Sequence, residues 1–341
     1  MKKRDYITVL SVLAAFAVVF LHTNCCFGEF SYGRYWKIAN IVQWILYCAV
    51  PIFLMITGAT LIDYHEKYST KEYIKKRVNK AVIPFVFWNF VALFFCIIVH
   101  KISLKSISFK LIFDGFFSVD NFNYFFWFFI FLFGIYLCIP VLSFIDKKYK
   151  NKVLLYLAIV GCAINCLIPF IFDAFKLDLR FQIPFICSGY LIYPIVGYLI
   201  DRNKLSLKLR IIIYSIGISC LLLQIIGTFI LSYKAGYLVK TFDGYWNIPC
   251  MFYSISVYIF FKHLCERINN KKIQGIFDKL SKYTFPIYLL HFFVLEIGYK
   301  VLNIDIRSIY FRAGAPLIII PSCILFTWLI RKIPFVKKIL P

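Results

Sequence analysis

Long apolar runs recur along the whole sequence and limit what the chain can fold into. Each run carries few charges and approaches the roughly 20 residues that a helix needs to cross a bilayer. Ten runs meet this requirement: 6–22, 39–62, 81–99, 122–142, 153–171, 183–200, 211–231, 246–261, 283–301 and 313–330. The segments between them show no internal repeat and no separate soluble domain. The sequence therefore predicts an all-α integral membrane protein, a bundle of about ten transmembrane helices in a single domain over 1–341.

Composition supports this class. Of the 341 residues, 62% are hydrophobic and 20% are aromatic, whereas soluble domains are about 45–50% apolar. The first run has a basic start but ends without the small-residue pattern of a cleavage site, which predicts a retained first span and not a signal peptide.

The lysines and arginines are unevenly distributed over the connecting segments. Alternate segments, starting from the N-terminus, hold 27 of the 39, the other segments hold 11, and Lys300 lies within a span. The positive-inside rule then predicts that both termini are cytoplasmic. The net charge of +23 is explained by topology and by attraction to anionic membrane lipid, so no nucleic-acid partner is predicted.

Ionisable groups within the spans are few, and such groups are functional candidates because their burial is costly. His22 closes the first run, either as an interfacial histidine bonded to water or as a group lining a cavity. His291 lies within the ninth run, either as a structural histidine between helices or in a cavity at another depth. Glu296 lies almost on the opposite helix face from His291, so it is expected to pair elsewhere.

A further candidate is the segment HEKYSTKEYIKKRVNKAVIPFVFWNF, which predicts an amphipathic helix entering the third span. Arg77 and Lys80 are spaced i, i+3 and are expected to share one face. Most charges here act as positive-inside anchors, but this pair could also bind a polyanion such as acyl-CoA, because both residue types bind phosphate. The motifs of nucleotide cradles, serine hydrolases and zinc sites do not occur, so neither a metal nor a permanently bound cofactor is predicted.

Six sequence blocks then follow in order. They are AAFAVVFLHTN with His22; PIFLMITGATLI with Pro51, Phe53, Thr57 and Gly58; KKRVNKAVIPFVFW with Arg77, Lys80 and Pro84; YFFWFFIFLFGIYLCIPVL with Trp127, Tyr136 and Pro140; GYLI at 197–200; and KLSKYTFPIYLLHFFVLE with Ser281, Ile287, Tyr288, Leu289 and His291. With the ten-span pattern, they are similar to acyltransferase family 3, especially its branch of bacterial surface-polysaccharide and enterobacterial-common-antigen O-acetyltransferases.

The resemblance implies a membrane O-acyltransferase of the bacterial cytoplasmic membrane. Such an enzyme moves an acyl group, usually acetyl, from acyl-CoA to a hydroxyl of a cell-surface polysaccharide or lipid-linked saccharide. His22 would be catalytic, as general base or as nucleophile. The donor would bind through Arg77, Lys80 and His291, and weaker candidates for acceptor contact are Trp127, Arg180 and Tyr288.

The first span departs from the family pattern. Family members commonly carry Asp-x-x-Arg there, whereas this chain has Thr8 and Ser11 at the two positions. Joint loss of both charges avoids leaving one of them buried without its partner. The departure keeps a second function open, a polysaccharide or lipid-linked saccharide exporter without acyl transfer.

Overall fold

The regular elements of the described chain are helices. The computed structural model describes residues 5–99, 101–117, 122, 124–178, 183, 185–187, 189–268, 270–302, 305–333 and 339–340. No strand occurs within these ranges, so the predicted all-α class is confirmed.

Eight helical stretches of the described residues are long and apolar enough to cross a membrane, which makes the chain a multi-pass membrane protein. They are Asp5–Thr23, Arg34–Glu66, Thr70–Ile98, Tyr124–Ser143, Lys147–Ala174, Leu207–Ala235, Ile248–Ile268 and Ile309–Ile330. The two other expected spans, 183–200 and 283–301, overlap α10 (Gly189–Arg202) and α14 (Thr284–Leu302). Ten crossings and cytoplasmic termini stay predictions.

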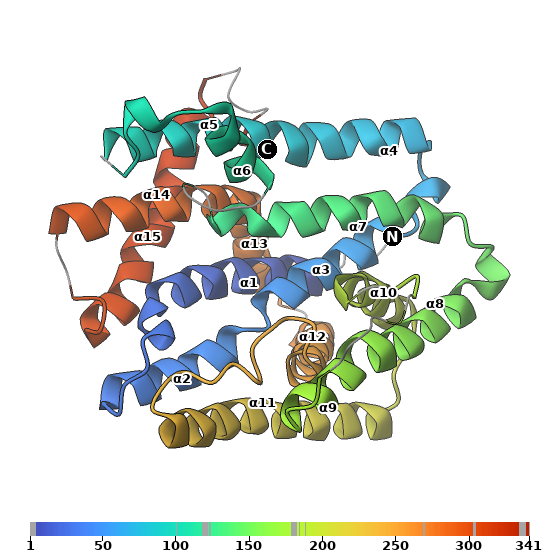
Figure 1. Cartoon of the computed structure of the whole chain (residues 1–341). Helices are drawn as coiled ribbons and strands as arrows, with labels where there is room; N and C mark the ends of the chain where they lie inside the picture. Colours follow the sequence, from blue (N-terminus) through green and yellow to red (C-terminus); the bar gives the residue numbers. More distant parts are fainter. Residues whose placement is uncertain are drawn as a thin grey trace. The chain divides into compact units, whose positions relative to one another are not determined.

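The chain divides into two compact units. Unit 1 comprises Met1–Ile62, Ile145–Thr284 and Ile304–Leu317. Its helices are α1 (Asp5–Thr23), α2 (Arg34–Leu46), α3 (Ala49–Leu61), α8 (Lys147–Cys162), α9 (Ile168–Ala174), α10, α11 (Leu207–Ala235), α12 (Ile248–Ile268), α13 (Lys271–Leu280) and the first part of α15 (Ile309–Ile330). Within this unit α1 packs on α3 and α12, α3 packs on α10, and α11 packs along α12 (Figure 1).

Unit 2 comprises Asp63–Phe144, Phe285–Asn303 and Ile318–Pro341. Its helices are α4 (Thr70–Arg77), α5 (Ile83–Ile98), α6 (Phe109–Phe117), α7 (Trp127–Ser143), most of α14 and the rest of α15. Its core is aromatic, with the ring of Phe85 against Phe129 at 5.1 Å and against Phe133 at 5.3 Å. Such contacts bury large apolar areas, which suits a unit rich in phenylalanine.

The second predicted span, 39–62, lies within the membrane-length stretch Arg34–Glu66, which is interrupted once. The chain forms α2, turns at Tyr47 and Cys48, and continues as α3. Pro51 explains the break, because proline has no N–H to donate to the carbonyl four residues earlier, which is that of Tyr47. Regular pairing resumes at once, since Ile52 donates its N–H to the carbonyl of Cys48 at 3.0 Å.

Helices α3 and α10 approach each other at two glycines. A Cβ on Gly58 would overlap the backbone of Pro194, and a Cβ on Gly197 would overlap the backbone of Met55. Small residues that allow backbones to meet are typical of helix packing in membranes. Two glycines of the family-like blocks therefore fix the α3–α10 packing.

Candidate functional site

His22 lies in the last turn of α1 and is half-buried. The residues that follow it are held firmly. Thr23 is fully buried and donates its hydroxyl to the carbonyls of Phe20 at 3.0 Å and Arg312 at 3.2 Å. Asn24 donates its side-chain N–H to the carbonyl of Ala39 at 2.9 Å. These bonds fix the end of α1, so the position of the imidazole is set by the fold.

The sequence interpretation missed Arg312, which lies in the first turn of α15. Its side chain is only 6% exposed, and its Nη1 donates to the carbonyl of Tyr35 at 3.1 Å. The Nε atom is buried without a hydrogen-bond partner in the described part of the chain. The signal was present, since an arginine opens the last apolar run, but it was counted only as a loop charge.

The positive charge of Arg312 is not balanced by a negative charge among the described residues. Among the described residues no carboxylate forms an ion pair with it, and Glu29 pairs with Arg307 at 3.2 Å instead. Cys26 lies beside the guanidinium, but burial raises the pKa of this thiol despite the opposing effect of Arg312. The thiol therefore stays neutral near pH 7, and a buried positive charge remains next to the segment that follows His22.

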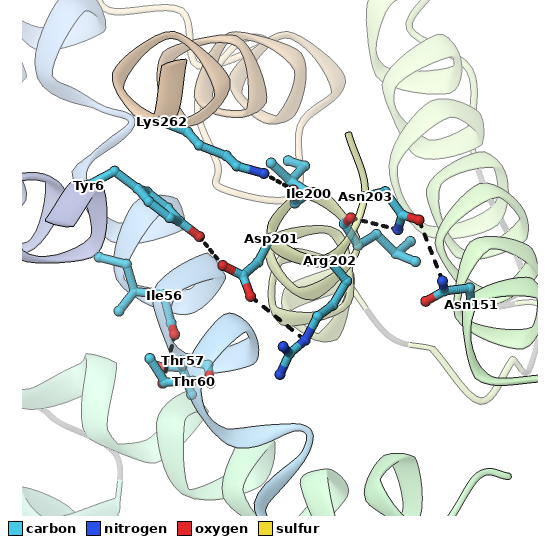
Figure 2. A network of polar contacts seen from close by, with 11 residues as sticks. Tyr6, Ile56, Thr57, Thr60, Asn151, Ile200, Asp201, Arg202, Asn203 and Lys262 are labelled. Atoms are coloured by element: carbon cyan, nitrogen blue, oxygen red, sulfur yellow. Dashed lines mark hydrogen bonds and ion pairs between the residues drawn. The ribbon is translucent and has the colours of Figure 1, made fainter. Parts of the chain in front are cut away.

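A second polar cluster lies at the opposite end of α1 (Figure 2). Tyr6 donates its hydroxyl to Oδ1 of Asp201 at 2.5 Å, and Nε of Arg202 lies 3.8 Å from Oδ2 of the same carboxylate. Lys262, which is 8% exposed, donates to the carbonyl of Ile200 at 2.5 Å. The cluster joins α1, α10 and α12.

Thr8 and Ser11, at the two positions of the absent family motif, form no side-chain hydrogen bond with this cluster within the described part of the chain. Ser11 donates its hydroxyl to the carbonyl of Thr8 at 2.8 Å, within α1 itself. Asp201 and Arg202 of α10 bring further charges to the start of α1, which itself carries Asp5, and sequence reading missed them because Tyr6 and Asp201 are 195 residues apart.

Arg77 ends α4 in unit 2 and is half-buried. Its guanidinium carbon lies 5.7 Å from the ring centre of Tyr73 and 5.4 Å from that of Tyr136, distances suited to cation–π attraction. Its Nε is buried and has no hydrogen-bond partner among the described residues. Tyr136, which belongs to one of the family-like blocks, thus lies against the side chain of Arg77.

Lys80 has different surroundings from Arg77. It is exposed, and it lies in a π-helical segment, Val78–Val82, that joins α4 to α5. The i, i+3 geometry of an α-helix does not apply across this wider turn, which explains the difference. Single π turns are frequent at functional sites.

His291 and Tyr288 are neighbours on α14 in unit 2. His291 is 1% exposed, and its Nδ1 lies 2.8 Å from the carbonyl of Tyr288 and 3.1 Å from that of Ile287. Nδ1 therefore carries the proton, because a carbonyl only accepts. Tyr288 donates its hydroxyl to the carbonyl of Phe125 at 2.7 Å, and the ring of Phe125 lies 5.5 Å from that of His291.

The remaining predicted residues are placed as follows. Trp127 begins α7, half-buried, with its ring 5.7 Å from Phe131. Arg180 lies outside the described residues. Glu296 forms an ion pair with Lys101, which confirms the expectation that it pairs elsewhere than with His291. Unit 2 thus brings Trp127, Tyr288 and His291 into one compact body with Arg77 and Lys80, while His22 belongs to unit 1.

The comparisons with known proteins identify the family of the chain. A family model described as an acyltransferase domain matches residues 4–331. No curated protein and no solved structure matches the chain. The matched range includes every predicted site residue and almost the whole chain, which supports a membrane acyltransferase. The chain therefore belongs to acyltransferase family 3.

Proposed function

We propose that this protein transfers an acyl group, most often acetyl, from acyl-CoA to a hydroxyl of a cell-surface polysaccharide or lipid-linked saccharide. It would act in the bacterial cytoplasmic membrane, as in the branch that modifies enterobacterial common antigen. The observation that carries the proposal is His22, a half-buried imidazole at the end of an apolar helix whose next residues are held by buried hydrogen bonds. Such a group can accept a proton near neutral pH.

The transfer step follows from the chemistry of the two substrates. A sugar hydroxyl is a weak acid and needs a base as it attacks the carbonyl carbon of the thioester. His22 accepts the hydroxyl proton while the new C–O bond forms. The C–S bond then breaks, and the leaving CoA sulfur takes the proton from the imidazolium. His22 could also act as a nucleophile, with a transient acyl-imidazole.

The donor side is supported by Arg77. Its Nε has no partner in the described residues, and the rings of Tyr73 and Tyr136 lie within cation–π distance of the guanidinium. A phosphate of CoA would supply the missing acceptor, since guanidinium groups bind phosphate with directed hydrogen bonds. Lys80, which is exposed nearby in sequence, would add attraction for the same polyanion.

The test is acetyl transfer by the purified protein. The protein in detergent or nanodiscs is incubated with acetyl-CoA labelled in the acetyl group and a bacterial surface glycan. Release of free CoA thiol together with label in the glycan would support the proposal. A protein that releases no CoA, and binds none at about a millimolar, near the upper end of ordinary substrate constants, would contradict it and favour the exporter.

Replacing Arg77 by alanine is expected to weaken acetyl-CoA binding about tenfold or more, because a hydrogen bond to a charged group contributes about 1.5–3 kcal/mol. Calorimetric titration with CoA measures this directly. Lys75→Ala is the matched control, since Lys75 is an exposed cation on the same helix. Equal losses in the two variants would show that only general positive charge matters.

Replacing Arg312 by methionine is expected to lower kcat by about tenfold or more, because a fixed positive charge near the reacting carbonyl stabilises developing negative charge. KM for acetyl-CoA should change little. Arg307→Met removes an exposed arginine of the same segment and should leave kcat within about twofold, since exposed ion pairs contribute little. An unchanged kcat in Arg312→Met would assign Arg312 to packing alone.

A further inference from the structure

A cavity of about 440 Å³ lies between α11 and α12 in unit 1. It is lined by Arg210, Tyr214, Phe260, His263, Leu264, Glu266 and Arg267. None of these residues belongs to the predicted catalytic, donor or acceptor sites. Arg210 and Arg267 bring two positive charges to this lining against the single carboxylate of Glu266, so an excess of positive charge faces the cavity.

Two nitrogen atoms at this cavity lack partners within the described chain. They are Nε of Arg210 and Nε2 of His263, both buried. The other ring nitrogen of His263, Nδ1, lies 2.9 Å from a carboxylate oxygen of Glu266, which orients the ring. Buried polar groups are normally hydrogen-bonded, and the Nε–H of Arg210 can only donate, so it indicates an acceptor that comes from outside the chain.

The chemistry of the lining selects the acceptor. Arginine binds phosphate through a planar set of donors. A phosphate group fits the excess of positive charge better than a neutral acceptor would.

The surface beside the cavity is apolar and exposed. Phe260 is 47% exposed, and Ile211, Ile212 and Ile216 of α11 are 54%, 46% and 40% exposed. On helices that cross a membrane, such side chains face lipid chains, whereas basic groups at helix ends lie at the headgroup level. A charged pocket at the end of an apolar surface has the polarity of a phospholipid.

We propose that this pocket binds the phosphate group of an anionic membrane lipid. The lipid headgroup would occupy the cavity between Arg210, His263 and Arg267, with its acyl chains along α11. This inference does not depend on acyl transfer, so it can stand or fall separately from the proposed function.

The test measures lipid binding by native mass spectrometry. The full-length protein in a neutral detergent is titrated with phosphatidylglycerol. The variant Arg210→Gln/Arg267→Gln is expected to bind it about tenfold more weakly or worse, because each lost charged hydrogen bond weakens binding strongly. The control Lys204→Gln/Lys208→Gln removes the same charge from exposed positions outside the cavity and should bind like the wild type.

The outcomes separate the sources of the phosphate. Inorganic phosphate should bind about tenfold more weakly than phosphatidylglycerol or worse, since it lacks acyl chains to place on the apolar surface. If inorganic phosphate bound as tightly as phosphatidylglycerol, the proposal that the phosphate group comes from a lipid would be overturned. Equal losses in the two double variants would overturn the site, because only general attraction to anionic lipid would remain. Thermal unfolding confirms that both variants are folded before binding is compared.

Discussion

His22→Ala is expected to lose acyl transfer by about a hundredfold or more, because general acid–base catalysis typically contributes factors of about 10²–10⁴. The loss should appear in kcat, since the imidazole moves a proton in the transition state and is not needed to hold CoA. The measurement is the initial rate of CoA release with acetyl-CoA and glycan, at saturating donor. Calorimetric binding of CoA should be unchanged.

Two further variants separate chemistry from structure at His22. His22→Gln keeps a similar size and a hydrogen-bonding group but cannot accept the proton, so it should be as inactive as His22→Ala. His65→Ala makes the same change at an exposed histidine of unit 2 and should keep the wild-type rate. Substantial activity in the His22→Gln variant would show that His22 is not the base.

The membrane-crossing helices could be predicted from the sequence because a helix exposed to lipid needs a long apolar run. The end of α1 at Thr23, directly after His22, follows from the same pattern. The break between α2 and α3 could also have been derived, since Pro51 removes the N–H that would pair with Tyr47. The prediction of 39–62 as one run did not take account of this missing hydrogen bond.

The buried polar contacts could not be read from the pattern of runs. Arg312 appears as an ordinary loop charge until the fold places its backbone against Thr23 and its side chain against Tyr35. Asp201 appears as a helix-end charge until Tyr6 is found beside it. Each depends on helix pairing between distant segments, which apolar periodicity does not encode.

The site in unit 2 shows the same division between local and distant information. The sequence places Arg77 and Lys80 three residues apart, and α-helical geometry then predicts a shared face. The π turn that separates their surroundings, and the ring of Tyr136 beside Arg77, come from the packing of the folded chain. Spacing alone therefore selected the two residues but did not predict their different surroundings.

Gly58→Ala is expected to destabilise the protein by about 3 kcal/mol or more, at or above the upper end of ordinary overpacking. The added methyl would overlap the carbonyl oxygen, carbonyl carbon and Cα of Pro194. These are backbone atoms of α10 and cannot rotate away as a side chain can, so α3 and α10 would have to separate. The measurement is the midpoint of thermal unfolding in detergent, with the monodisperse fraction after purification.

Gly134→Ala is the matched control, since Gly134 also lies within a helix, α7, and nothing lies within 4 Å of a Cβ added there. Alanine should be neutral or stabilising at that position, because glycine costs about 1 kcal/mol relative to alanine within a helix. Gly197→Ala should match Gly58→Ala, since its methyl would overlap the backbone of Met55 on the facing helix. A Gly58→Ala protein that unfolds at the wild-type temperature would show that α3 and α10 do not meet at these glycines. The two family-like blocks around them would then need an explanation other than packing.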